Sequence, residues 1–288
     1  MRHKLGLSLL ALMIALLGAL VVVVTPTSYA DSSSAGLPQL PTAPDGDPPG
    51  ANDWSCTPST ERPEPVILVH GTFGDRKHLL ERLSARIKKA GFCVFSLDYG
   101  NRGLDDIRKS AKQLKRYTER VLAATGATKV SMVGHSQGGM MPRYYIKFLG
   151  GAKVVDDLVG ISPSNHGTAL TDAGLNPISE LVGFACRACV QQGAGSRFLT
   201  HLNRGDETPG RVSYTQIVTR YDEVVVPYTS GNLAAGPRTT NITVQDKCPL
   251  AFPDHLLNPL ARPTVDITLN ALTHAGPARR SYQPSCLP

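Results

Sequence analysis

The sequence predicts an α/β fold, because short apolar segments typical of buried strands alternate along the chain with segments of helical periodicity. Strands are predicted where apolar residues follow one another closely, at 65–70, 130–134 and 214–220. Helices are predicted where apolar residues recur at three- and four-residue spacing, at 107–121, 140–149 and 264–272. Polar residues and glycines follow the predicted strands, and loops at these ends of such a sheet commonly carry functional groups.

The first 30 residues have the pattern of an export signal. Arg2 and Lys4 precede an uncharged apolar run at 5–24, and Ser28-Tyr29-Ala30 provides the small-x-small pattern that a signal peptidase accepts. We expect this segment to be removed and the protein to be secreted. The alternative is a retained membrane anchor, because about 20 apolar residues are enough to span a bilayer.

Residues 31–62 form a Pro-, Ser- and Gly-rich leader that we expect to drape over the body of the protein or to trail from it. Residues 63–288 are long enough for one large domain with its own core. Removal of Arg2 and Lys4 would lower the net charge from +7 to +5, which is mild. The basic residues at 102–120 lie on a predicted helix opened by Asp105 and Asp106, so we interpret them as a solvated face and expect no nucleic-acid partner.

All six cysteines lie in the part expected to be exported, where an even number implies three disulfides: Cys56, Cys93, Cys186, Cys189, Cys248 and Cys286. The Cys186-Arg-Ala-Cys189 spacing lacks the second ligand pair that a zinc site would need. It also lacks the βαβ context of a redox motif. We therefore expect structural disulfides, whose pairing these spacings leave open.

The stretch Gly134-His-Ser-Gln-Gly138 joins a predicted strand to a predicted helix. A serine on such a turn is pushed out of the sheet, and the tight backbone leaves room only for glycine at Gly134 and Gly138. The following helix directs its N-terminal dipole toward any negative charge that forms there. Ser136 is therefore the candidate nucleophile.

A serine hydroxyl needs an imidazole to take its proton, and the imidazole needs a carboxylate to orient it. Asp222 follows the predicted strand at 214–220, with Glu223 as its neighbouring rival. Two histidines come later, His255 and His274. His255 lies in a Pro-containing loop and His274 lies beyond a predicted helix, so we favour the combination of Ser136, Asp222 and His255.

An oxyanion hole would complete this site. The N–H of Gln137 follows the nucleophile, and the loop after the strand at 65–70 brings a second N–H, from Thr72 or Phe73. His70 precedes that loop and the serine, so we interpret it as a structural residue that holds the loop.

These motifs together resemble the secreted class 2 lipases of actinobacteria. The resemblance runs from about residue 65 to the C-terminus and rests on four motifs in order, at 70–74, 133–145, 164–168 and 219–227. It implies an α/β-hydrolase fold with a mostly parallel central sheet, helices on both faces and a lid or pocket insertion. It also implies hydrolysis of carboxylic esters, including long-chain acylglycerols, without a redox or nucleotide cofactor. We expect 63–288 to form a monomeric extracellular catalytic domain, and we assign no metal ligands in the sequence. Ser136, Asp222 and His255 occupy the matching catalytic positions.

The sequence is also distantly similar to the fungal lipase B type, which likewise has Asp followed by Glu after its sixth strand. This likeness implies disulfides between Cys56 and Cys93 and between Cys248 and Cys286. It leaves Cys186 and Cys189 to close a very short loop.

The segment 166–203 carries apolar residues at helical intervals and is either a lid or acyl-pocket wall, or a plain buried helix. His166 is a loop residue expected to shape the site without a catalytic role. We predict a triacylglycerol lipase acting through an acyl-enzyme at a lipid–water interface. The alternatives are a short-chain carboxylesterase, a polyester hydrolase, an acyltransferase, a non-catalytic binding module, or an anchored interaction protein if the signal is retained.

Overall fold

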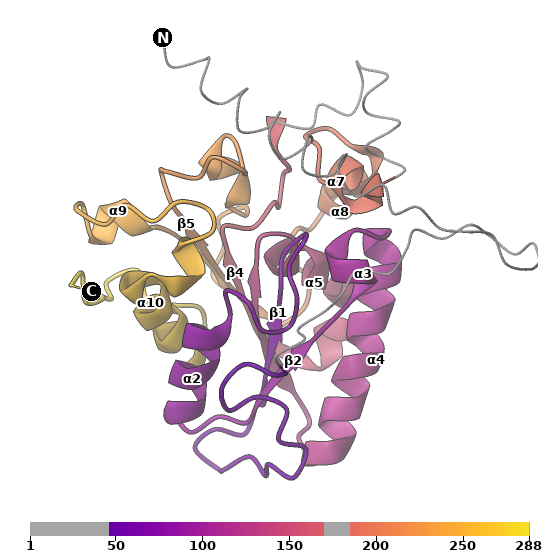
Figure 1. Ribbon diagram of the computed structural model, residues 1–288, viewed down its shortest axis with the longest axis vertical. Helices are drawn as coiled ribbons and strands as arrows, with labels where there is room; N and C mark the ends of the chain where they lie inside the picture. Colours follow the sequence, from indigo (N-terminus) through magenta and orange to yellow (C-terminus); the bar gives the residue numbers. More distant parts are fainter. Residues whose placement is uncertain (1–45, 170–184, 288) are drawn as a thin grey trace, which may run out of the picture. The chain divides into compact units, whose positions relative to one another are not determined.

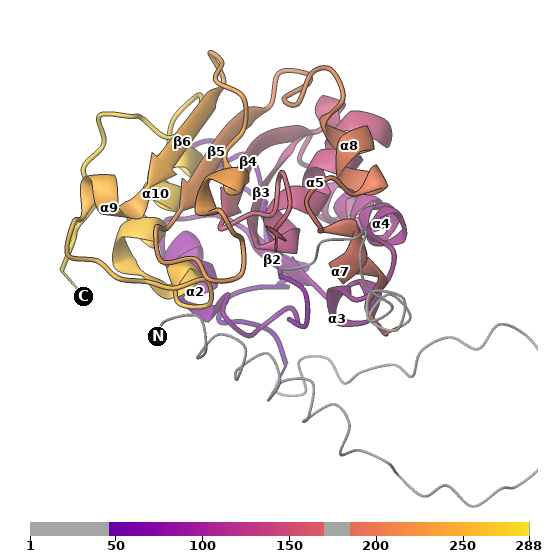
Figure 2. The same ribbon diagram turned by 90° about the horizontal axis from the view of Figure 1, so that it is seen from above.

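The computed structural model describes residues 46–169 and 185–287. The predicted signal and most of the predicted leader lie outside these residues, so the boundaries at 30 and 62 stay predictions. The described residues form one six-stranded sheet in which all neighbouring strands are parallel, in the order β2-β1-β3-β4-β5-β6 (Figures 1 and 2). The strands are β1 (Val66–Val69), β2 (Val94–Leu97), β3 (Val130–His135), β4 (Val155–Ile161), β5 (Ser213–Val218) and β6 (Thr239–Thr243).

Helices cover both faces of this sheet (Figures 1 and 2). One face is covered by α2 (Glu81–Lys89) and α10 (Arg262–Leu272), and the other by α4 (Ile107–Thr125) and α5 (Gln137–Phe148). Shorter helical segments are α3 (Gly100–Gly103), η1 (Gly151–Lys153), α7 (Arg187–Gln191), α8 (Arg197–Asn203), η3 (Tyr228–Gly231), α9 (Val244–Lys247) and η4 (Asn258–Leu260).

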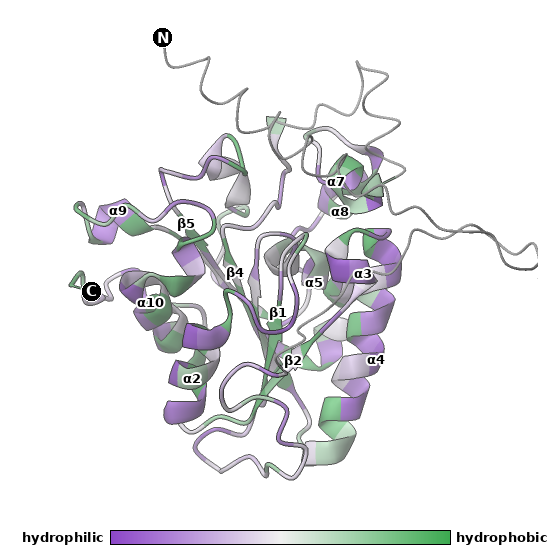
Figure 3. Ribbon diagram, in the orientation of Figure 1, coloured by the Kyte–Doolittle hydropathy of each residue, from purple (hydrophilic) through white to green (hydrophobic). Residues whose placement is uncertain are grey.

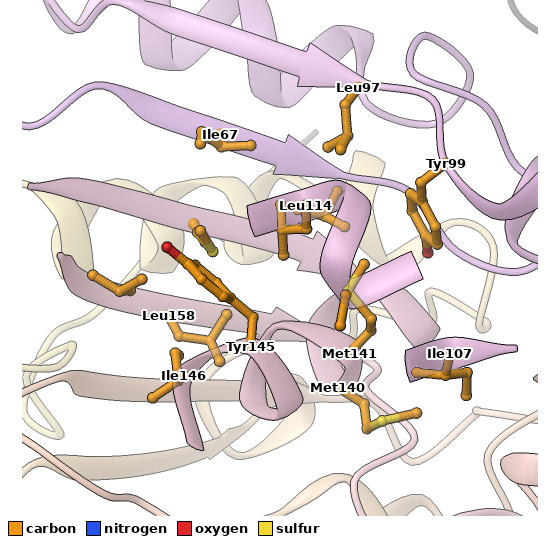
Figure 4. Close-up of a cluster of buried hydrophobic side chains, with 14 of the residues drawn as sticks. Ile67, Leu97, Tyr99, Ile107, Leu114, Met140, Met141, Tyr145, Ile146 and Leu158 are labelled. Carbon is orange, nitrogen blue, oxygen red and sulfur yellow. The ribbon is translucent and has the colours of Figure 1, made fainter. Parts of the chain in front are cut away.

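The alternation of side chains along a strand divides the hydrophobic core into two layers. In β1, Ile67 and Val69 join the buried cluster that packs on α4 and α5, whereas Val66 and Leu68 join the cluster on α2 and α10. Figure 4 shows part of the first cluster, and Figure 3 shows hydrophobic strands between helices of mixed hydropathy. A sheet covered on both faces explains why the strands read as continuous apolar runs.

The predicted elements are confirmed, with a difference at the start of α4. Asp105 and Asp106 precede this helix instead of lying in its first turn. The carboxylate of Asp106 accepts a hydrogen bond of 2.8 Å from the N–H of Arg108, so Asp106 is the N-cap. The residues before it form the short α3, in which Asn101 and Arg102 have left-handed backbone angles. No helix among the described residues is long and apolar enough to cross a membrane.

The described end of the predicted leader packs against the edge strand β2. Ala51 pairs with Val94, and the Trp54 ring lies 5.0 Å from that of Phe95. This part of the leader is draped over the body of the protein.

Three disulfides are present, Cys56–Cys93, Cys186–Cys189 and Cys248–Cys286, which are the pairs that the likeness to lipase B implied.

Candidate active site

Ser136 lies at the sharp turn between β3 and α5. Its backbone angles, φ 56° and ψ −123°, are strained for a residue with a side chain. A Cβ at Gly134 would lie 1.9 Å from the carbonyl oxygen of Gly138, and a Cβ at Gly138 would lie 2.1 Å from that of Val69. Both positions therefore require glycine, as the sequence predicted.

Asp222 and His255 form a buried pair beside this turn. Asp222 comes shortly after β5, and His255 lies on the loop between α9 and η4. The Nδ1 of His255 lies 2.8 and 2.9 Å from the two carboxylate oxygens of Asp222. Burial raises the pKa of Asp222, but the hydrogen bond from His255 and further favourable contacts outweigh it and lower this pKa overall. Because Nδ1 donates to the carboxylate, Nε2 is the nitrogen left to accept a proton from a substrate or a nucleophile.

Two side chains that the sequence reasoning did not assign hold the backbone of His255. The Nε2 of His135, the residue before Ser136, donates to the carbonyl oxygen of His255 at 2.9 Å. The two imidazole rings lie 4.8 Å apart. The N–H of His255 donates to the carboxylate of Glu223, the residue after Asp222, at 3.1 Å. Glu223, the rival acid in the sequence, therefore bonds to the backbone of His255 and not to its imidazole. His274, the rival base, interacts with the carbonyl of Ala275.

The loop after β1 approaches the nucleophile closely, since a Cβ at Gly71 would lie 3.0 Å from the Cβ of Ser136. The N–H of Phe73 donates to the carbonyl of Arg102 at 2.7 Å. The side-chain oxygen of Thr72 accepts hydrogen bonds from the amides of Gln137 and Gln192, at 2.8 and 2.9 Å. These bonds fix the loop against the start of α5.

His70 is fully buried, and its Nδ1 donates to the carbonyl of Gly71 at 2.7 Å. Its ring stacks on Tyr99 with centroids 4.2 Å apart. Burial lowers the pKa of His70 to about 4, so the ring stays neutral at ordinary pH. These contacts fit the expected role in holding the loop.

A second polar network supports the loop after β4 and was not predicted. The buried guanidinium of Arg143, on α5, donates to side-chain oxygens of Asn165 and Asn203. Burial lowers the pKa of Arg143 to about 10. His166 pairs with Glu207 at 2.8 Å, and this hydrogen bond is the main reason that the pKa of His166 is raised and that of Glu207 is lowered to about 2. Arg143 lies in the motif at 133–145, but nothing in its spacing distinguishes it from a surface cation.

Large apolar side chains are exposed on the loops that carry this site. Among the described residues, the exposed large hydrophobic side chains fall mostly on the loops at 71–74, 221–224 and 250–257: Phe73, Tyr221, Val224, Leu250, Phe252, Leu256 and Leu257. Tyr221 and Phe252 touch, with ring centroids 5.2 Å apart. Isolated exposed hydrophobic residues are ordinary, whereas their concentration on neighbouring loops indicates a surface with a function.

Comparison with known proteins identifies the family of this chain. The family model described as Lipase (class 2) matches residues 63–255, which include Ser136, Asp222 and His255. The chain belongs to the class 2 lipase family. Two curated relatives of this class 2 lipase are triacylglycerol lipases of Pseudarthrobacter phenanthrenivorans and Burkholderia plantarii, each 40% identical over 92 residues, or 28% of this chain. The match spans only 27% and 24% of the length of these relatives.

Solved structures similar to this class 2 lipase show the same fold. Aspergillus fumigatus lipase B matches with a TM-score of 0.66 and 23% identity, over 81% of this chain and 57% of the other. Bacillus licheniformis lipase BlEst2 in its mature form matches with a TM-score of 0.59 and 17% identity, over 75% of this chain and 94% of the other. At this level of identity the likeness establishes the α/β-hydrolase fold and leaves the activity to be argued from the site.

Proposed function

We propose that this class 2 lipase is a secreted serine ester hydrolase that acts on acylglycerols. The observation that carries the proposal is the buried Asp222–His255 pair beside a serine held in a strained turn. This arrangement provides a nucleophile, a base and the carboxylate that orients the base.

In the proposed reaction, Nε2 of His255 takes the hydroxyl proton of Ser136 as the serine oxygen attacks the ester carbonyl. Asp222 holds the imidazole in the tautomer that permits this and stabilises the imidazolium that forms. The imidazolium then protonates the leaving alcohol, and a water molecule, activated by the same base, releases the acid from the acyl-enzyme.

We assign the oxyanion hole to the N–H groups of Gln137 and Thr72. Gln137 is the first residue of α5, and N–H groups in the first turn of a helix have no acceptor within the helix. Of the two N–H groups predicted for the other side, that of Phe73 already donates to Arg102, which favours Thr72.

Exposed apolar loops favour a lipid substrate over a small soluble ester. Leu250 is 85% exposed and Phe252 is 62% exposed, and both lie on the loop that carries His255. Apolar side chains on the loops around a site favour adsorption to a lipid surface, since contact with lipid removes them from water. The predicted lid or pocket wall at 166–203 is described only at its ends, which contain α7 and α8, and residues 170–184 lie outside the described part of the chain.

Hydrolysis of a chain-length series of esters, each below and above its solubility limit, tests the proposal. We expect activity on emulsified long-chain triacylglycerol that Ser136→Ala reduces by about 10⁴-fold or more. Near-normal turnover by Ser136→Ala would contradict the assignment of the nucleophile. Activity confined to short soluble esters would favour a carboxylesterase, and activity on a polymeric ester would favour a polyester hydrolase. Transfer to an added alcohol would favour an acyltransferase, and no reaction with any ester would favour a binding module.

A further inference from the structure

Two side chains from distant parts of the chain hold the peptide N–H and the carbonyl oxygen of His255. His255 lies on a loop outside the named helices and strands, so no regular hydrogen-bond ladder fixes it. Its carbonyl oxygen accepts from the side chain of His135, and its N–H donates to the side chain of Glu223. His135 is the residue before the proposed nucleophile, and Glu223 is the residue after the proposed acid. The nucleophile and the acid therefore each have a chain neighbour whose side chain holds the backbone of the base.

We infer that His135 and Glu223 act together as positioning residues that fix the backbone of His255 between Ser136 and Asp222. This inference rests on the proposed function and extends it, since neither residue would touch the substrate. We call the pair the base clamp.

The chemistry of His135 fits this role. A carbonyl oxygen only accepts hydrogen bonds, so Nε2 of His135 must carry the proton. His135 is buried, and burial together with the neighbouring His255 lowers the pKa of His135 to about 3. The imidazole of His135 therefore stays neutral at ordinary pH and keeps one defined proton, on Nε2.

Glu223 contributes the opposite half of the base clamp. Its side-chain oxygen Oε2 accepts a hydrogen bond of 3.1 Å from the peptide N–H of His255. The side chains of Glu223 and Asp222 therefore hold different parts of the same residue, the backbone N–H and the imidazole Nδ1. Proton transfer is sensitive to this placement, because a displacement of about 1 Å in a catalytic site can reduce the rate by about 10²-fold.

The loop has other attachments that should keep it folded when the base clamp is removed. Thr219 donates to the carbonyl of Pro253 at 2.7 Å, and Tyr221 pairs with Asp254 in an isolated β-bridge. Loss of the base clamp should therefore shift His255 and leave the rest of the fold in place.

Two pairs of variants test the base clamp. His135→Leu and Glu223→Ala remove the donor and the acceptor, whereas His135→Gln keeps an N–H at the end of the side chain and Glu223→Gln keeps an oxygen acceptor without the charge. His274→Leu is the control, since it makes the same change as His135→Leu at a histidine outside the site. The measurements are kcat and KM on a soluble short-chain ester, with active sites counted by a phosphonate that labels Ser136.

We expect His135→Leu and Glu223→Ala to lower kcat by at least about tenfold, and by up to about 10²-fold, with KM unchanged and one labelled serine per chain. The two conservative variants should recover most of the rate, and His274→Leu should match the wild type. The inference would be overturned if Glu223→Gln were as slow as Glu223→Ala, because the charge and not the acceptor would then matter. It would also be overturned if the rate fell only in proportion to the number of labelled sites, which is what partial unfolding produces.

A measurement that requires no ester hydrolysis separates this inference from the proposed function. The Nδ1 proton of His255 bonded to Asp222 should give a separate downfield proton resonance in the folded protein. We expect His135→Leu and Glu223→Ala to shift or broaden this resonance and His274→Leu to leave it unchanged. An unchanged resonance in both clamp variants would refute the base clamp, even if the wild type hydrolysed no ester. A wild type that neither hydrolyses esters nor reacts with the phosphonate would refute the proposed function alone.

Discussion

Replacement of Gly138 by alanine should separate the two halves of the proposed oxyanion hole. The added Cβ would lie 2.1 Å from the carbonyl oxygen of Val69 and 2.3 Å from that of His70. Relief of these contacts requires α5 to move away from the end of β1 by about 1 Å, because overpacked cores respond with backbone shifts. Gln137 moves with the helix and Thr72 follows β1 directly, so the hydrogen bond between their side chains would stretch and their N–H groups would no longer converge on one oxygen.

Loss of one oxyanion donor reduces kcat by about 10²- to 10³-fold, and we expect a loss of this size in Gly138→Ala. Overpacking should also lower the free energy of unfolding by about 1–3 kcal/mol. The assays are kcat on a soluble ester and urea denaturation. The matched control is Gly236→Ala, where the nearest atom would be the side-chain oxygen of Thr239 at 3.8 Å. Wild-type kcat and stability in Gly138→Ala would refute the packing argument for the turn.

Three further predictions concern the proposed acid Asp222, the ion pair of His166 and Glu207, and the short disulfide. Asp222→Asn should reduce kcat by about 10⁴-fold with little change in KM, because the same change in a serine protease triad reduces kcat by this factor. A loss below tenfold would contradict the role of Asp222 as the orienting acid. The pair of His166 and Glu207 should stabilise the fold below about pH 6.5, and this contribution should be lost as the pH rises through the raised pKa of His166. Because the pKa of Glu207 is lowered to about 2, its part of the contribution is full above about pH 4.3 and is lost as the pH falls from there toward about 2. Glu207→Gln should therefore flatten the decline of the melting temperature between about pH 6 and 8, and an unchanged decline would show that another group causes it. Removal of both Cys186 and Cys189, which are three residues apart, should cost about 1.6 kcal/mol by loop entropy, less than half of the value for either long-loop disulfide, and urea denaturation of the three double variants would test this order.

The strands, the main helices and the turn at Ser136 were predictable because each leaves a local pattern. Buried parallel strands are apolar throughout, covering helices carry an apolar stripe, and the turn at Ser136 requires glycine on both sides. The start of α4 was less predictable, because a capping aspartate and an aspartate in the first turn look alike in the sequence.

Residues without a local pattern were missed. In the sequence, His135 is only part of the turn, Glu223 is only a rival acid, and Arg143 is only one residue of the motif at 133–145. Their roles depend on partners far along the chain, since His135 and His255 are 120 residues apart and Arg143 and Asn203 are 60 apart. Such contacts follow from the way parallel strands bring distant loops to one edge of the sheet.

The sequence by itself determined the class of fold, the turn at Ser136 and the chemical identity of the residues around it, because hydrophobic period and turn chemistry act over a few neighbouring residues. The resemblance to class 2 lipases added the expected ester substrates, and the likeness to fungal lipase B added the pairing of the cysteines. Only the tertiary structure decided which carboxylate faces the imidazole and which takes the N–H of His255. Asp222 and Glu223 are adjacent and chemically alike, and their roles separate only when the loop at 250–257 folds back over the end of β5.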